Sequence, residues 1–177
     1  MRDDDIIGFF DESSPQTKSN TQRFWSFGKP IVYKNTSKFR ANSFGFYPIN
    51  GKPVIGFRKR SKKRDVRSFI KRIRKANPKG RIVLILDNFS SHKAKIVREC
   101  AKQLNILLVY LPKYSPDLNP IEYIWKDVKR EISKIFIKNL NHLKRVILKK
   151  FLECGEKLSY AKSWIHKFAG LCISPKV

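Results

Sequence analysis

Short apolar runs, each bounded by polar or turn residues, predict the strands of this chain. They lie at residues 6–10, 82–86 and 106–111. The second and third are unbroken aliphatic stretches, which is typical of strands covered on both faces. An aromatic stretch at residues 39–57, interrupted by Asn50-Gly51, predicts a hairpin, and residues 23–27 predict a further aromatic strand. We therefore expect antiparallel strands in the first third of the chain.

Apolar residues at spacings of three and four predict helices at residues 65–76, 93–104, 119–135, 140–152 and 159–171. Residues 82–111 form a strand-helix-strand pattern, which predicts a parallel strand pair. The helix near residue 119 has a marked start, with Asn119 as N-cap, Pro120 in the first turn and Glu122 three residues after the cap. Its expected buried stripe is Ile121, Ile124, Trp125, Val128, Ile132 and Ile135. The whole pattern predicts an α/β fold with a mixed sheet flanked by helices.

The charge of the chain indicates its partner. Its 177 residues suit one domain, and 39 Lys and Arg against 14 Asp and Glu give a net charge of +25. Such a field attracts polyanions over a long range, so we expect nucleic acid as the partner. The cluster at residues 58–64 could be a solvated face or a localisation signal, but its size favours phosphate contacts. The expected DNA contacts are Arg58, Lys59, Arg60, Lys62, Lys63, Arg64, Lys93, Lys113, Lys126, Lys129 and Arg130.

A disulfide framework, a structural zinc site and a membrane segment are not predicted. Cys100, Cys154 and Cys172 are isolated, without a Cys-x-x-Cys pair or a His at zinc-like spacing. The start, MRDDDIIGFF, has three aspartates where a signal peptide has basic residues, and the apolar runs are too short to span a bilayer. We expect a cytoplasmic protein, associated with the nucleoid if the source is prokaryotic, and no membrane partner.

Three carboxylates are expected to meet at one edge of the sheet. Asp11 and Asp87 follow two of the apolar runs, and open sheets bind ligands at the carboxyl ends of their strands. Glu122 follows Asp87 after 34 intervening residues, in a helix turn that returns to the same rim. Carboxylate oxygens bind Mg²⁺, and two ions about 3.5–4 Å apart can activate an attacking oxygen and stabilise a leaving one. This predicts metal-dependent chemistry on nucleic acid.

Each of these residues also has a structural interpretation. Glu122 occupies a capping-box position relative to Asn119, and Asp87 could be a turn residue at a strand end. Asp11 has Glu12 as its neighbour and further aspartates close by. His92 is expected to be a hydrogen-bonding group of the loop rather than a metal ligand. The three tryptophans, Trp25, Trp125 and Trp164, are assigned to the core.

Two motifs resemble the catalytic domain of the Tc/mariner-type transposases, in particular their prokaryotic insertion-sequence branch. They are LILDNFSSHKA at residues 84–94 and LPKYSPDLNPIEYIWKDVKRE at residues 111–131. The resemblance rests on Asp87, Asn88 and His92, on the loop that ends at Glu122, and on the 34-residue gap. FFDESSPQ and the later RFWSFGKP resemble the first catalytic strand of that family and the aromatic strand after it, which strengthens Asp11. The resemblance covers about residues 6–134.

The resemblance implies a ribonuclease H-like core at about residues 6–136, followed by C-terminal helices at about 139–172, in one catalytic domain spanning 1–177. It implies Asp11, Asp87 and Glu122 as catalytic metal ligands, Mg²⁺ or Mn²⁺ as cofactor with two ions, and double-stranded DNA as substrate. The implied reaction is cut-and-paste transposition, in which the element ends are nicked and the freed 3′-hydroxyl attacks target DNA.

One departure from the family leaves alternatives open. Family members carry helix-turn-helix modules upstream, whereas Met1 here lies a few residues before the first catalytic strand. We expect either half of a split reading frame, with a separate helix-turn-helix polypeptide and a second copy of the chain as candidate partners, or a truncated copy. The alternative functions are an inactive remnant that binds nucleic acid through its charge, and a related nuclease acting on RNA or branched DNA.

Overall fold

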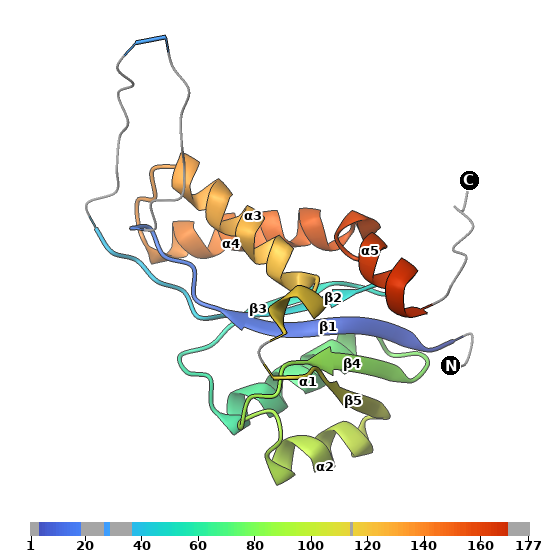
Figure 1. Ribbon diagram of the computed structural model, residues 1–177. Coiled ribbons are helices and arrows are strands. Elements are labelled where there is room, and N and C mark those ends of the chain that lie inside the picture. The colour runs from blue at the N-terminus through green and yellow to red at the C-terminus, as the bar shows by residue number, and fades with distance from the viewer. Residues whose placement is uncertain (1–3, 19–26, 29–36, 114, 170–177) are drawn as a thin grey trace.

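A five-stranded mixed sheet forms the centre of the molecule (Figure 1). The computed structural model describes residues 4–18, 27–28, 37–113 and 115–169 of the chain. The strands, in the spatial order β3-β2-β1-β4-β5, are β1 (Ile6–Ser13), β2 (Ser43–Pro48), β3 (Val54–Phe57), β4 (Ile82–Leu86) and β5 (Ile106–Tyr110). β2 pairs antiparallel with β1 and β3, whereas β4 pairs parallel with β1 and β5. The predicted mixed sheet is confirmed.

Helices cover both faces of this sheet (Figure 1). The helices are α1 (Lys63–Ala76), α2 (Lys95–Gln103), α3 (Ile121–Lys134), α4 (Leu140–Gly155) and α5 (Lys162–Trp164). Short 3-10 turns lie at Pro116–Leu118 and Leu158–Tyr160, and a π-helical segment lies at Ile165–Ala169. α1 and α2 lie on one face, and α3, α4 and α5 lie on the other. The predicted strand-helix-strand unit is formed by β4, α2 and β5.

Alternation along β1 divides the core into two clusters. Phe9 belongs to the cluster under α3 and α4, which includes Trp125, whereas Phe10 belongs to the cluster under α1, where its ring lies 5.5 Å from that of Phe69. Because successive side chains of a strand point to opposite faces, Asp11 shares the face of Phe9 and Glu12 shares the face of Phe10. The strand thus separates two adjacent carboxylates that the sequence places side by side.

Two predictions about the strands are corrected. Asp11 and Glu12 lie inside β1 rather than in a loop after it, because they continue the pairing with β2 opposite Gly45 and Phe44. The run at residues 106–111 is covered on one face instead of two, with Leu107 and Val109 exposed by 46% and 39%. The reason is that β5 forms the edge of the sheet, while α3 and α4 contact β1, β2 and β3.

The boundaries of all five predicted helices differ from those expected. α2 is shorter at both ends, and α4 continues three residues beyond its predicted end, to Gly155. α1 begins at Lys63, two residues before its predicted start, and α3 begins at Ile121, so that Pro120 rather than Asn119 precedes it as the cap. Ile135 lies just beyond the end of α3 and is only partly buried. The single helix predicted at residues 159–171 is replaced by the shorter turns described above.

Several predictions fall partly outside the described residues. These are the aromatic strand at residues 23–27, apart from Phe27, together with Trp25 and Cys172. Trp125 is fully buried and Trp164 packs against the same core cluster. Cys100 and Cys154 are buried free thiols. Within the described part of the chain, the helices are too short or too polar to cross a membrane.

Candidate catalytic site

The parallel pairing of β1 with β4 places Asp11 beside Asp87. Phe10 is paired with Leu86 at the end of this ladder, so the two aspartates are the next residues on neighbouring strands. Neighbouring strands lie about 4.8 Å apart. Asp11 is only 8% exposed, whereas the Asp87 side chain is half exposed. The register thus places two carboxylates close together at the carboxyl edge of the sheet.

Glu122 reaches the same place from α3. The chain leaves β5 at Leu111, whose backbone N–H donates to the carbonyl of Leu86 over 2.9 Å, and then loops back to the start of α3. A cavity of about 400 Å³ opens at this edge. Its lining includes Asp11, Asp87 and Glu122 together with Asn88, Phe89, Lys113 and Asn119. The structure therefore brings all three predicted carboxylates to one cavity.

The structure removes the capping interpretation of Glu122. Because α3 begins at Ile121, Glu122 is the second residue of the helix, and its backbone N–H donates to the Asn119 carbonyl over 3.0 Å. The cap position, Pro120, has no side chain that could accept a hydrogen bond. Glu122 is therefore free of the reciprocal capping contact that the sequence allowed.

His92 joins Asp87 to a carboxylate on the other face of the sheet. The imidazole is 2% exposed, and its Nδ1 lies 2.6 Å from Oδ1 of Asp87 while its Nε2 lies 3.3 Å from Oε1 of Glu12. Asp87 Oδ1 also accepts the backbone N–H of Phe89 over 3.1 Å. Both contacts use Oδ1, and together they fix the orientation of the Asp87 carboxylate. His92 is a buried hydrogen-bonding group of the loop, in agreement with its prediction.

The titration of these groups reflects their surroundings. Burial raises the pKa of Asp11 to about 8, and the nearby carboxylates of Glu122 and Asp87 act in the same direction. Burial alone would lower the pKa of His92, but the hydrogen bonds with Asp87 and Glu12 outweigh it and raise the pKa to about 9. Burial opposes ionisation of Asp87, but the contacts with His92 prevail and lower its pKa. The site thus brings several carboxyl groups together, and the raised pKa of Asp11 means that this carboxyl group loses its proton only at a higher pH than usual.

The donor atoms at this cavity suit a hard divalent cation. Carboxylate and amide oxygens are the ligands that Mg²⁺ and similar ions take. Besides the carboxylates, the Oδ1 atoms of Asn88 and Asn119 are buried there without a hydrogen-bond partner. As they stand, no three Asp, Glu, His or Cys side chains of the described residues are gathered closely enough to hold an ion. The cavity therefore offers oxygen atoms of the right chemistry, although they are not gathered around one point.

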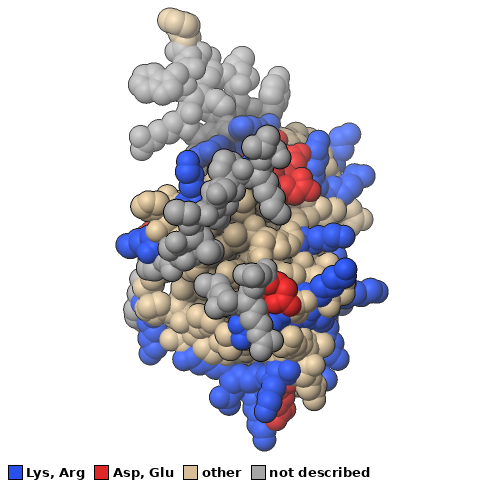
Figure 2. All heavy atoms as spheres, turned by 90° about the vertical axis from the view of Figure 1, so that its right-hand side faces the viewer, with Lys and Arg blue, Asp and Glu red and all other residues tan. Residues whose placement is uncertain are grey.

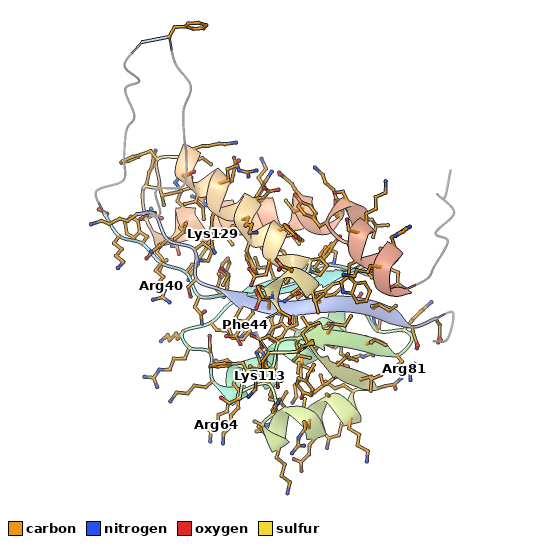
Figure 3. The ribbon with its side chains drawn as sticks, in the orientation of Figure 1. Arg40, Phe44, Arg64, Arg81, Lys113 and Lys129 are labelled. Carbon is orange, nitrogen blue, oxygen red and sulfur yellow. The ribbon has the colours of Figure 1, made fainter. Side chains whose placement is uncertain are left out.

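The predicted DNA contacts lie mainly on the surface. Arg58 and Lys129 are partly buried, whereas the other nine are exposed. Lys113 lines the same cavity as the three carboxylates, and Arg64 lies at the start of α1, below the edge at which β1 ends (Figure 3). Arg130 forms an ion pair of 2.8 Å with Asp127. Basic side chains also surround the face on the side where β1 begins (Figure 2). Positive charge is therefore spread widely over the surface.

Sequence reasoning missed Glu12 and Asn119 as parts of this site. From the sequence, Glu12 is expected only as a neighbour of Asp11, and Asn119 only as a helix cap. The alternation of β1 was the available signal for Glu12, since a strand extended by three residues places it on the opposite face. No sequence signal distinguishes a capping Asn119 from one whose side chain faces a cavity.

Comparison with known proteins gives a matching family, a relative that is similar in sequence, and a set of structural matches. The DDE superfamily endonuclease family matches residues 7–144. The transposable element Tcb2 transposase of Caenorhabditis briggsae is 36% identical over 55 residues, which are 31% of this chain and 20% of that protein. The Mos1 transposase in its paired-end complex with the left transposon end has a TM-score of 0.67 at 18% identity, covering 91% of this chain and 51% of its own.

A second structure, the Mos1 transposase catalytic domain with Raltegravir and Mn, has a TM-score of 0.65 at 17% identity and covers 91% of this chain and 76% of its own. The likeness covers 91% of this chain in both structures, so the predicted ribonuclease H-like fold is confirmed. The chain spans about a fifth of the Tcb2 transposase and about half of the Mos1 chain in the paired-end complex.

Proposed function

The chain belongs to the DDE superfamily endonuclease family, and on that premise we propose that it is the catalytic domain of a DNA transposase. It cleaves phosphodiester bonds at element ends and joins the freed 3′-hydroxyl to target DNA. The observation that carries this proposal is the convergence of Asp11, Asp87 and Glu122 on one cavity at the carboxyl edge of the sheet. The net charge of +25 supports a polyanionic substrate.

Asp11, Asp87 and Glu122 would hold two divalent ions, Mg²⁺ or Mn²⁺. When bound, such ions supply Lewis-acid activation of the attacking oxygen and neutralise charge at the leaving oxygen. Ionised carboxylates that face one another repel, as the raised pKa of Asp11 indicates, and a cation removes that repulsion. The unpartnered amide oxygens of Asn88 and Asn119 would accept hydrogen bonds from water at the ions.

The remaining residues of the site position the carboxylates and the substrate. His92, held by Glu12, would keep Asp87 ionised and oriented with Oδ1 turned to the imidazole. Lys113, exposed at the cavity, would contact the phosphate next to the reacting one. Burial of Asp11 would keep water away from one side of the reacting centre.

The wider assembly belongs to the same proposal. Recognition of element ends would require a helix-turn-helix unit, and pairing of two ends would require a second copy of the chain. The organisation as one domain over residues 1–177 stays a prediction, and so does location in the cytoplasm with the nucleoid.

The decisive experiment compares the wild type with Asp87→Asn in a nicking assay on duplex DNA with Mg²⁺. We expect Asp87→Asn to lose cleavage while its DNA affinity, measured in EDTA, stays within about twofold of the wild type, since the basic surface is unchanged. Asp117→Asn, which removes an exposed carboxylate from the neighbouring loop, is the matched control and should cleave normally. Cleavage that survives Asp87→Asn would reject the proposal.

The charge of the chain favours one alternative, a protein that binds nucleic acid without cleaving it. This alternative predicts that the wild type binds nucleic acid with a steep salt dependence and shows no metal-dependent turnover. Parallel reactions on DNA duplex, DNA–RNA hybrid, RNA and branched DNA would identify the related nuclease activity instead.

A further inference from the structure

A second cavity, of about 620 Å³, lies at the β3 side of the catalytic edge. Four basic side chains line it, those of Arg40, Arg58, Lys59 and Lys144. We propose that this basic groove binds the phosphodiester backbone of duplex DNA flanking the cleaved bond. The proposal rests on the proposed function in taking DNA as the ligand, and it adds a second DNA contact surface, including Arg40 and Lys144, away from the reacting centre.

The sheet topology puts the groove on the same edge as the carboxylates. β3 is antiparallel to β2, which is antiparallel to β1, so β3 and β1 run in the same direction. Arg58 follows the end of β3, as Ser14, which also lines the groove, follows the end of β1. Arg40 lies at this edge, whereas Arg81 lies at the opposite one (Figure 3). DNA held at the catalytic cavity can therefore continue into the groove.

Its charge distinguishes the groove from the other cavities near the site. The catalytic cavity is lined by three carboxylates and Lys113. A cavity between α3 and the C-terminal turns combines three basic residues with Asp117 and Asp127. In the basic groove, the described lining residues include no carboxylate at all. A phosphate that enters it is neutralised without competition from a protein anion.

Hydrogen bonds between three chain segments build the floor of the groove. The side chain of Asn42 accepts from Ser14 Oγ over 3.2 Å and donates to Ser61 Oγ over 3.1 Å. The backbone carbonyl of Asn42 accepts the backbone N–H of Arg58 over 3.0 Å. The Arg58 guanidinium donates to the Phe57 carbonyl over 3.0 Å, which fixes its direction. The groove is thus formed before any ligand binds, and this lowers the entropic cost of binding.

The start of α4 adds to the positive field. Leu140, the first residue of this 16-residue helix, lines the groove, and the first turn of α4 contains no acidic residue. The amino end of a helix carries a partial positive charge that favours phosphate. Lys144, one turn further along, places its Nζ 5.7 Å from the centre of the Phe57 ring. The amino end of α4 and the basic side chains therefore both attract a bound anion.

The composition of the groove favours backbone contacts over contacts with bases. Bases bound as single strands stack on accessible aromatic rings. The one described ring in the lining is Phe57, which is partly buried and has Lys144 above it. Basic side chains without a stacking surface suit the phosphates of a duplex, largely without regard to sequence.

The test replaces two groove residues that have no part in the catalytic cavity. Arg40→Ala/Lys144→Ala is compared with Arg98→Ala/Lys102→Ala, a matched pair of exposed residues on α2. Binding of labelled duplex DNA is measured by fluorescence anisotropy in EDTA over a range of salt concentrations. We expect the groove pair to weaken binding about tenfold and to reduce the log–log salt slope by about 2, close to 0.9 for each lost phosphate contact.

The proposal would be overturned if the groove pair had the same salt slope and DNA affinity as the wild type. It would also be overturned if the α2 pair lost as much DNA affinity as the groove pair, because the basic surface would then attract DNA only diffusely. A loss confined to single-stranded DNA would also overturn it. Thermal unfolding should give the same midpoint for both pairs and the wild type. Because binding in EDTA requires no catalysis, a wild type that fails to cleave DNA would contradict the proposed function and leave the result on the groove standing.

Discussion

The two ends of the β1–β4 strand pair carry opposite electrostatic arrangements. The ladder runs from Ile6 opposite Ile82 to Phe10 opposite Leu86. One step before it, Asp5 meets Arg81, whose Nε and Nη2 donate to the two carboxylate oxygens over 3.1 and 2.5 Å. One step after it, Asp11 meets Asp87. Asp5 and Asp11 are both nearly buried, at 3% and 8% exposure.

From this difference we infer that the Asp5 end of the strand pair is structural and that the Asp11 end is functional. The hydrogen bond with Asp5 raises the pKa of Arg81, because the guanidinium is paired with a carboxylate there. At the other end burial and two carboxylates raise the pKa of Asp11 to about 8, so full ionisation there costs free energy. A fold keeps such an arrangement where a ligand compensates it, and perturbed pKa values gather at functional sites for that reason. The uncompensated end is the one that we propose binds metal ions.

The largest effect is expected from Asp11→Asn. We expect cleavage with Mg²⁺ to fall by about a thousandfold, equivalent to about 4 kcal/mol in the barrier, because an ion ligand is lost. Mg²⁺ should raise the midpoint of thermal unfolding of the wild type and leave that of Asp11→Asn unchanged. If Asp11→Asn still cleaved DNA with Mg²⁺ and were still stabilised by Mg²⁺, Asp11 would not bind the ion.

The opposite end should respond in stability instead of chemistry. Asp5→Ala removes the partner of Arg81 and should lower the free energy of unfolding, because the buried Asp5 carboxylate accepts two hydrogen bonds from that guanidinium. Denaturant unfolding measures this loss, and Asp4→Ala, at an exposed neighbour, is the control. The Mg²⁺ dependence of the remaining folded protein should match that of the wild type. Loss of that dependence would contradict the separation of the two ends.

A smaller effect is expected from Glu12→Gln. This change weakens the contact with His92 Nε2 and thereby the orientation of Asp87, which should reduce the cleavage rate about 10–100-fold, as for other residues that orient metal ligands. The apparent Mg²⁺ affinity should weaken with it, while DNA binding in EDTA stays the same. Glu99→Gln, at an exposed position on α2, is the control. An unchanged rate and Mg²⁺ affinity would limit Glu12 to a structural role.

The smallest effect concerns stability without metal. With a folded-state pKa of about 8 against a usual 3.8, Asp11 binds its proton more tightly when folded, so its contribution to stability falls as pH rises from 4 to 8. The side chain of Asn does not titrate, so its contribution to stability does not change over this pH range. In EDTA, the free energy of unfolding of Asp11→Asn should therefore exceed that of the wild type by at least about 1 kcal/mol more at pH 8 than at pH 5. This corresponds to about 2–4 °C in the midpoint of thermal unfolding. An equal gain at both pH values would mean that Asp11 titrates normally.

The local elements followed from the sequence. The aliphatic run of β4 and the stripes of α1 and α3 predicted those elements to within two residues, because alternation and helical periodicity are set by neighbours along the chain. The strand-helix-strand pattern predicted the parallel pairing of β4 and β5. The three carboxylates were predicted to meet, and the structure brings them to one cavity, while their roles remain proposals.

The tertiary structure alone decided what depends on residues distant in the sequence. Pairing with β2 kept Asp11 and Glu12 inside β1 and so directed them to opposite faces. The position of β5 at the sheet edge left Leu107 and Val109 exposed, although their pattern is that of a buried strand. The basic groove combines Arg40 with Lys144 from separate parts of the chain. Local spacing determines which residues share a face, but burial and electrostatic partners depend on packing between elements.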